Sequence, residues 1–134
     1  MSLEIHERDR EGIAILDLDG RLTVGGEMAQ YRETMQKLID AGKRSIVLNM
    51  EKVDYVDSTG LGAMVMTYTT MQKAGGKMKL LNLTRRSIEL LVMTKLTTIF
   101  EVFDDEQNAV NSFFPDREIK HFDILSFVQQ MKEE

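Results

Sequence analysis

Apolar residues alternate with polar ones, or run together in short blocks, at five places along the chain, and each place predicts a β-strand. The first two strands are expected at 3–8 and 13–18, where the Glu11-Gly12 turn joins them into a hairpin and Gly20 ends the second. The first is predicted as an edge strand. Three further runs follow at 45–50, 78–83 and 99–103. The run at 45–50 is apolar enough for a strand that is buried on both faces.

Between these strands, apolar residues recur at the spacing of an α-helix. One stripe runs from Met28 to Ile39 and is followed by Gly42, which we expect at the C-terminal cap. A second stripe, Leu61 to Met71, is followed by Gly75-Gly76. Two helices are thus predicted between the second and fourth strands.

Two more helices are predicted from their expected capping residues. Thr84 is a suitable N-cap for a third helix. Asp104, with Gln107 three residues later, resembles a capping box that would open a fourth helix carrying Phe113 and Phe114. The predicted fold class is therefore α/β: a five-stranded mixed sheet, in which an N-terminal hairpin is followed by parallel strands, with four helices.

Pro115 is the only proline and marks a boundary. Beyond it, apolar residues recur every three positions, which predicts an extra amphipathic C-terminal helix that buries Phe122, Leu125 and Val128. We therefore divide the chain into a domain at 1–114 and an extension at 115–134. The extension can pack on its own domain, on a second copy of the chain in a homodimer, or on a binding partner.

The composition excludes several classes of function. The chain has 134 residues, of which 17 are basic and 22 acidic, giving a net charge of −5, whereas nucleic-acid-binding domains usually carry a basic surface. The absence of cysteine excludes disulfides, thiolate catalysis and cysteine-ligated zinc. No apolar run approaches the roughly 20 residues that cross a bilayer, and no secretory signal is recognisable. We expect a cytoplasmic protein without membrane insertion.

The sequence also lacks the motifs of common enzymes. His6 and His121 do not have the spacing of metal ligands. Ser58 does not lie in a Gly-x-Ser-x-Gly turn, and the chain contains no phosphate-binding P-loop. We therefore expect no catalytic residue, no metal and no cofactor.

One stretch between a predicted strand and a predicted helix contains a recognisable motif, and its first residues are expected in a loop. This stretch reads Val53-Asp54-Tyr55-Val56-Asp57-Ser58-Thr59-Gly60-Leu61-Gly62. Together with Gly20-Arg21-Leu22, Ile46-Val47-Leu48-Asn49 and Ala74-Gly75-Gly76, it resembles the STAS domain family. This domain is shared by bacterial anti-sigma factor antagonists, also called anti-anti-sigma factors, and by the cytoplasmic tails of sulfate transporters. The resemblance covers about residues 3–114.

The resemblance implies a switch in transcription regulation and signal transduction. Ser58 would be phosphorylated by an anti-sigma factor that is also a serine kinase, and a PP2C-type phosphatase would remove the phosphate. The dephosphorylated domain would bind the anti-sigma factor and so free its sigma factor. The residues expected to contact this partner are Asp57, Ser58, Thr59, Gly60 and Leu61, with Thr23 on an earlier loop.

The residues themselves are compatible with this role. Ser58 is expected at the N-cap of a helix, where a phosphate is tolerated because free amides and the helix dipole favour anions. A phosphate adds about −1.5 to −2 charges, so the switch can be a change of surface rather than of fold. We expect phosphorylation on Ser58 rather than Thr59, which would point along the side of the helix. A capping role alone is the competing interpretation of Ser58.

One position departs from the family pattern and leaves a second function open. Well-known antagonists have an aspartate where this chain has Thr23, so the partner or its mode of contact differs. The alternative is a structural STAS subunit of a larger assembly, such as a stressosome-like complex or the accessory subunit of a lipid ABC transporter. A nucleotide-binding domain has only the glycine-rich turns in its favour.

Overall fold

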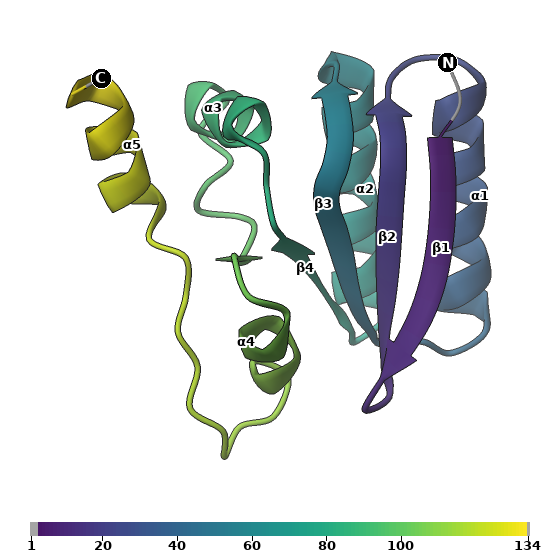
Figure 1. Cartoon of the computed structure of the whole chain (residues 1–134). Coiled ribbons are helices and arrows are strands. Elements are labelled where there is room, and N and C mark those ends of the chain that lie inside the picture. Colours follow the sequence, from purple (N-terminus) through teal and green to yellow (C-terminus); the bar gives the residue numbers. More distant parts are fainter. Residues whose placement is uncertain (1–2, 134) are drawn as a thin grey trace.

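The computed structural model describes residues 3–133 and contains a five-stranded sheet with helices on both of its faces (Figure 1). The strands follow their sequence order across the sheet, and β1 pairs antiparallel with β2 whereas the other neighbours are parallel. The predicted mixed sheet with an N-terminal hairpin and an edge position for the first strand is confirmed. The strands are β1 (Leu3–Arg10), β2 (Ile13–Leu22), β3 (Ser45–Val56), β4 (Lys77–Leu81) and β5 (Val102–Phe103).

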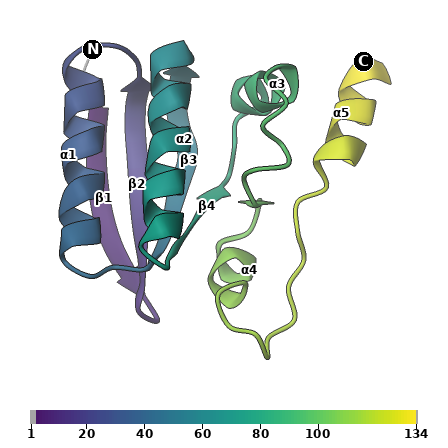
Figure 2. The same ribbon diagram turned by 180° about the vertical axis from the view of Figure 1, so that it is seen from behind.

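The sheet divides the core into two parts. The larger part joins one face of the sheet to buried side chains of the first three helices, and Figure 2 shows two of them, α1 and α2, in front of the strands. The smaller part joins the other face to Ala109 and Val110 of α4. The helices are α1 (Gly26–Asp40), α2 (Ser58–Lys73), α3 (Arg85–Met93), α4 (Glu106–Asn111) and α5 (Ile124–Glu133), so four helices and an added C-terminal one are confirmed.

The parallel strands β2 and β3 extend further than the sequence predicts. β2 continues past Gly20 to Leu22, and β3 includes the predicted loop up to Val56, which pairs with Leu22. In this half of β3 only Val53 and Val56 are buried, so the apolar pattern that marks a strand is lost although the backbone pairing continues. Because both strands run on, they bring the start of α2 to the end of β2.

The last two strands are shorter than predicted. β4 ends at Leu81 because Asn82 takes a positive φ of 55°, which interrupts extended backbone. β5 has only two residues, and Ile99, which was expected to begin it, instead donates a backbone hydrogen bond to the Leu96 carbonyl in a turn. This edge of the sheet is therefore short.

The predicted helix boundaries at Gly42 and Thr84 are confirmed. Gly42 follows the end of α1 with a φ of 86°, and its amide donates to the carbonyl of Ile39 at 3.0 Å. The Thr84 hydroxyl accepts a hydrogen bond from the amide of Ser87 at 3.1 Å and so caps α3.

The predicted capping box at Asp104 is wrong. Asp105 is the N-cap of α4, because its extended backbone lets its carboxylate accept from the Asn108 amide at 2.9 Å. The Gln107 side chain bonds Arg10 and Asn111 instead of turning back to the cap. α4 also ends at Asn111, so Phe113 and Phe114 pack on the smaller core from the turn that follows the helix.

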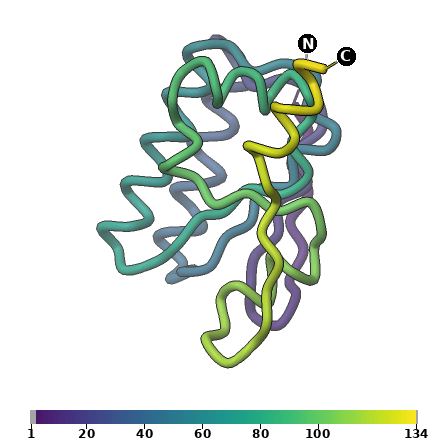
Figure 3. Tube along the Cα trace, turned by 90° about the vertical axis from the view of Figure 1, so that its left-hand side faces the viewer, coloured from purple at the N-terminus to yellow at the C-terminus, as the bar shows by residue number. Residues whose placement is uncertain are grey.

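The C-terminal tail packs on its own domain, the first of the three surfaces considered above. Arg117 pairs with Glu11 at 2.7 Å, and the Phe122 amide donates to the Val102 carbonyl of β5 at 3.2 Å. Figure 3 shows the tail in yellow crossing the molecule on this side. The tail therefore covers the free edge of β5, which would otherwise present unpaired backbone groups.

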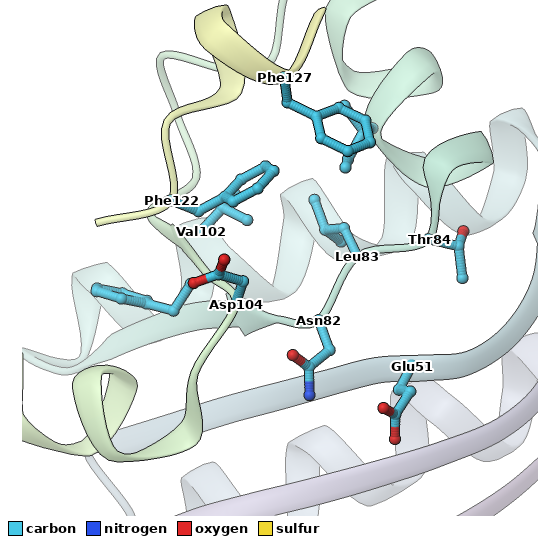
Figure 4. A pocket seen from close by; sticks show the side chains of 10 residues that line it. Glu51, Asn82, Leu83, Thr84, Val102, Asp104, Phe122 and Phe127 are labelled. Carbon is cyan, nitrogen blue, oxygen red and sulfur yellow. The ribbon is translucent and has the colours of Figure 1, made fainter. Parts of the chain in front are cut away.

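The aromatic side chains of the tail face the domain, but one predicted contact is absent. Phe122 and Phe127 lie above Val102 and Leu83 across a pocket of about 350 Å³ (Figure 4). Leu125 was predicted to be buried and is 82 % exposed, because it lies on the outer side of the helix that begins at Ile124, whereas Phe127 and Val128 lie on the inner side. The prediction for Leu125 is wrong, and Phe122 and Val128 are half-buried.

We expect Phe122→Ala to lower the free energy of unfolding by about 1–2 kcal/mol, since a half-buried phenyl ring loses part of its apolar contact. Leu125→Ala is the matched control on the same segment and should change it by less than about 0.5 kcal/mol. Urea unfolding of the two variants measures both values. Equal effects at the two positions would contradict the packing described for the tail.

Candidate functional site

The motif that resembles the STAS family lies at one end of the sheet, where β3 passes into α2. Only Asp57 separates the last residue of β3 from the first residue of α2. β2 runs parallel to β3 and ends beside it, with Leu22 paired to Val56. The loop that follows β2, which contains Thr23, is therefore adjacent to the start of α2.

Asp57 is the N-cap of α2 and also holds the neighbouring loop. One carboxylate oxygen accepts from the Gly60 amide at 2.8 Å, and the other accepts from the Val24 amide at 3.0 Å. The Asp57 amide in turn donates to the Leu22 carbonyl at 3.2 Å. One side chain thus fixes the first turn of α2 and the loop after β2 to each other.

The predicted N-cap at Ser58 is corrected by this geometry. Asp57 has the extended backbone of a capping residue, with φ −91° and ψ −178°, and its side chain reaches the amide three residues on. Ser58 is the first residue inside the helix. Its side chain is exposed and makes no hydrogen bond to the described part of the chain. The hydroxyl that was expected to be occupied by capping is therefore free.

The two amides also determine the ionisation of Asp57. The hydrogen bond from Gly60, followed by that from Val24, lowers the pKa of the Asp57 carboxyl below its usual value. At neutral pH a fixed negative charge consequently lies next to Ser58.

The tight entry of β3 into α2 requires glycine at position 60. A Cβ at Gly60 would lie 2.0 Å from the carbonyl oxygen and 2.8 Å from the carbonyl carbon of Leu22. Leu61, the next residue, is buried in the larger core and anchors the first turn. At Gly62, by contrast, an added Cβ would meet nothing within 4 Å.

The predicted contact residues therefore differ in accessibility. Ser58 is exposed, whereas Thr23, Asp57 and Thr59 are half-buried. Gly60 and Leu61 are buried and pack inside the domain.

Exposed apolar side chains occur on α2 and on the loop held by Asp57. Val24, whose amide is bound by Asp57, is 70 % exposed, and Met66 is 63 % exposed. Met66 lies two helical turns after Ser58, so both residues belong to one stripe of α2 together with the exposed Gly62. Large apolar side chains are usually withdrawn from water, and several at one place are typical of a protein interaction surface.

Sequence reasoning missed the contribution of α3 to this surface. A groove of about 290 Å³ runs from Ser58 to α3 and contains Tyr55, Arg86 and Met93 among its lining residues. Met93 is 80 % exposed. The predicted alternation of parallel strands and helices could have indicated it. Because β3 and β4 are adjacent and parallel, the helices that follow them, α2 and α3, start at the same end of the sheet.

Groups of His, Asp or Glu that could hold a metal ion are absent from residues 3–133. Over the same range, none of the helices is long and apolar enough to cross a membrane.

We expect Gly60→Ala to lower the free energy of unfolding by about 3 kcal/mol or more, because the new methyl group overlaps the Leu22 backbone. Gly62→Ala is the control and should raise it by roughly 0.5–1 kcal/mol, since alanine is the better helix former at an open position. Thermal or urea unfolding distinguishes the two. A tolerated alanine at position 60 would contradict the close approach of α2 to β2.

Asp57 should make stability depend on acid pH. Its pKa is lowered on folding, so its contribution is complete above the unfolded value of about 3.9 and disappears as the pH falls through the folded value. Asp57→Asn retains one acceptor and should cost about 1 kcal/mol at pH 7. We expect the difference between the two proteins to narrow below about pH 4. Urea unfolding from pH 7 to pH 3 measures it, and a difference that is constant with pH would refute the assignment.

Most of the chain matches a known protein family. The STAS domain family matches residues 4–109. The anti-sigma-B factor antagonist of Bacillus subtilis is 33% identical over 97 residues, which cover 69% of this chain and 88% of that protein. The anti-sigma F factor antagonist of Paenibacillus polymyxa is 29% identical over 113 residues, covering 82% and 94%.

The fold is also shared with solved structures. An anti-sigma factor antagonist from Mycobacterium paratuberculosis superposes with a TM-score of 0.73 at 15% identity, covering 82% of this chain and 92% of that one. With a family match over residues 4–109 and relatives that are named anti-sigma factor antagonists, this chain belongs to the STAS domain family.

Proposed function

We propose that this chain is an anti-sigma factor antagonist whose binding to its partner is controlled by phosphorylation of Ser58. The observation that carries the proposal is the position of the Ser58 hydroxyl. It is exposed, it makes no hydrogen bond to residues 3–133, and it lies at the start of a helix in a groove that also contains the exposed Met93. A modifying enzyme can therefore reach it without opening the fold.

The surface around Ser58 supports protein binding in the dephosphorylated state. Val24, Met66 and Met93 are each at least 63 % exposed, and the groove beside Ser58 offers a place for a partner's side chain. Burying such side chains contributes roughly 25 cal/mol per Å² of apolar area. The neutral serine hydroxyl can enter this interface at a much lower desolvation cost than a charged group.

A phosphate on Ser58 would reverse this balance. A doubly charged group inside an interface must lose its hydration, and the ionised Asp57 next to it adds further negative charge. The fold would tolerate the same phosphate, since it lies at the positive end of the α2 dipole. Ser58 is preferred over Thr59 because Thr59 is half-buried.

The partners in this proposal follow from the relatives, which are named antagonists of anti-sigma factors. The chain would bind an anti-sigma factor that is also a serine kinase, and a PP2C-type phosphatase would restore the bound state. This cycle places it in the bacterial cytoplasm and needs no cofactor and no catalysis by the chain. The contacts would be made by Thr23 and by residues 57–61.

A structural STAS subunit is the second candidate, and two features favour it. Thr23 stands where well-known antagonists have an aspartate, and the tail after residue 114 adds surface that lies outside the family match at 4–109. In such an assembly the exposed apolar side chains would be permanently covered, and Ser58 need not be modified.

Partner binding by Ser58 variants distinguishes the two. We expect Ser58→Ala to retain an anti-sigma factor from the native host in a pull-down, whereas Ser58→Asp should bind it about tenfold more weakly or worse by calorimetry, since a charge enters the interface. The melting temperature should change little, because an acidic residue is favourable in the first turn of a helix.

Thr98→Asp is the charge control, because it adds the same charge at an exposed turn before β5. It should bind like the unmodified protein. Equal affinity of Ser58→Ala and Ser58→Asp would reject the switch, and capture of transporter or stressosome-like subunits by both would favour the structural role.

A further inference from the structure

The groove between α2 and α3 brings a cationic side chain into the same hollow as Ser58. Its lining comes from the end of β3, the first residue of α2 and the α3 helix, and it includes Tyr55, Ser58, Arg86 and Glu89. Among the described residues that line it, Arg86 carries the only positive charge. An anion formed on Ser58 would therefore share a confined space with one guanidinium.

The Arg86 guanidinium is not committed to a carboxylate. Its Cζ atom lies 5.6 Å from the centre of the Tyr55 ring, an exposed cation–π contact of modest strength. No ion pair or hydrogen bond of the Arg86 side chain is found within residues 3–133. The neighbouring Arg85 differs, because its Nε atom pairs with Glu89 at 3.7 Å.

The groove already contains negative charges, so a phosphate on Ser58 would be stabilised there by a cation. Asp57 is ionised, and its two oxygens are bound to backbone amides and not to a cation. Glu89 is the other carboxylate in the lining, and it is held by Arg85. A phosphate on Ser58 would add about two negative charges next to Asp57, and an arginine fork is the side chain best suited to receive them.

We propose that Arg86 is the intramolecular receptor for the phosphate on Ser58, exchanging its contact with the Tyr55 ring for a charge-assisted pair with the phosphate. This inference rests on the proposed function in that Ser58 is the modified residue, and it adds how the modified state is held. In that state the phosphate is fixed between α2 and α3, and the groove is closed to a partner's side chain.

The titration of the phosphate tests this without a kinase or a partner. Phosphoserine is introduced at position 58 during translation by an amber-suppression system, and the second pKa of the phosphate is followed by ³¹P NMR. A nearby guanidinium favours the dianion, so we expect Arg86→Gln to raise this pKa by about 0.5 pH units over the phosphorylated parent protein. Arg86→Lys should recover part of the difference.

Arg85→Gln is the matched control, because it removes the same charge from the adjacent residue outside the groove lining. It should leave the phosphate pKa within about 0.1 unit of the parent protein if the effect is specific to the groove. An unchanged pKa in Arg86→Gln, or an equal rise in Arg85→Gln, would overturn the proposal. If the pKa shifts as expected but the phosphorylated protein still binds the anti-sigma factor, the proposed switch fails while the assignment of Arg86 stands.

Discussion

The Asp57 carboxylate is the contact on which the arrangement of the site depends. Its two oxygens accept from backbone amides that lie 36 residues apart in the chain, at Val24 and Gly60. The pair of bonds is possible only because β2 and β3 are parallel and end side by side. The loop after β2 and the helix after β3 therefore meet at one end of the sheet. Because Asp57 satisfies the helix end, Ser58 is released from a structural task and its hydroxyl is available to other proteins.

The same geometry explains why the site is both rigid and accessible. Gly60 lets the backbone of α2 approach Leu22 closely, and the buried Leu61 fixes the first turn against the core. The exposed stripe of α2 then begins at Ser58 and continues to Met66. In the proposed function, a partner would meet a preformed surface at a small cost in ordering entropy, and a phosphate would change the charge of that surface without unfolding it.

Most of the fold could be predicted from the sequence, because strands buried on both faces and amphipathic helices leave strong periodic signals. The failures lie where backbone pairing continues without an apolar pattern, as in β3 from Asp54 to Val56, or where two neighbouring residues can both cap a helix. At both Asp57-Ser58 and Asp104-Asp105, the residue with extended backbone and a reachable amide is the cap, and such geometry is not visible in the sequence. The motif at the site was recognisable, but the share of α3 in the surface depends on how parallel strands place successive helices.

The tail shows how a segment outside the family match can become part of the domain. It lies along β5, the shortest strand and the free edge of the sheet, where the Phe122 amide binds the Val102 carbonyl. A five-stranded sheet that ends in a two-residue strand would leave apolar side chains of α3 and β5 partly open to water, and Phe122 and Phe127 lie over that opening (Figure 4). The tail lines pockets at β5, whereas the groove beside Ser58 is lined by β3, α2 and α3 alone. The edge that the tail protects and the surface that a partner would use are therefore separate, so covering the one leaves the other accessible.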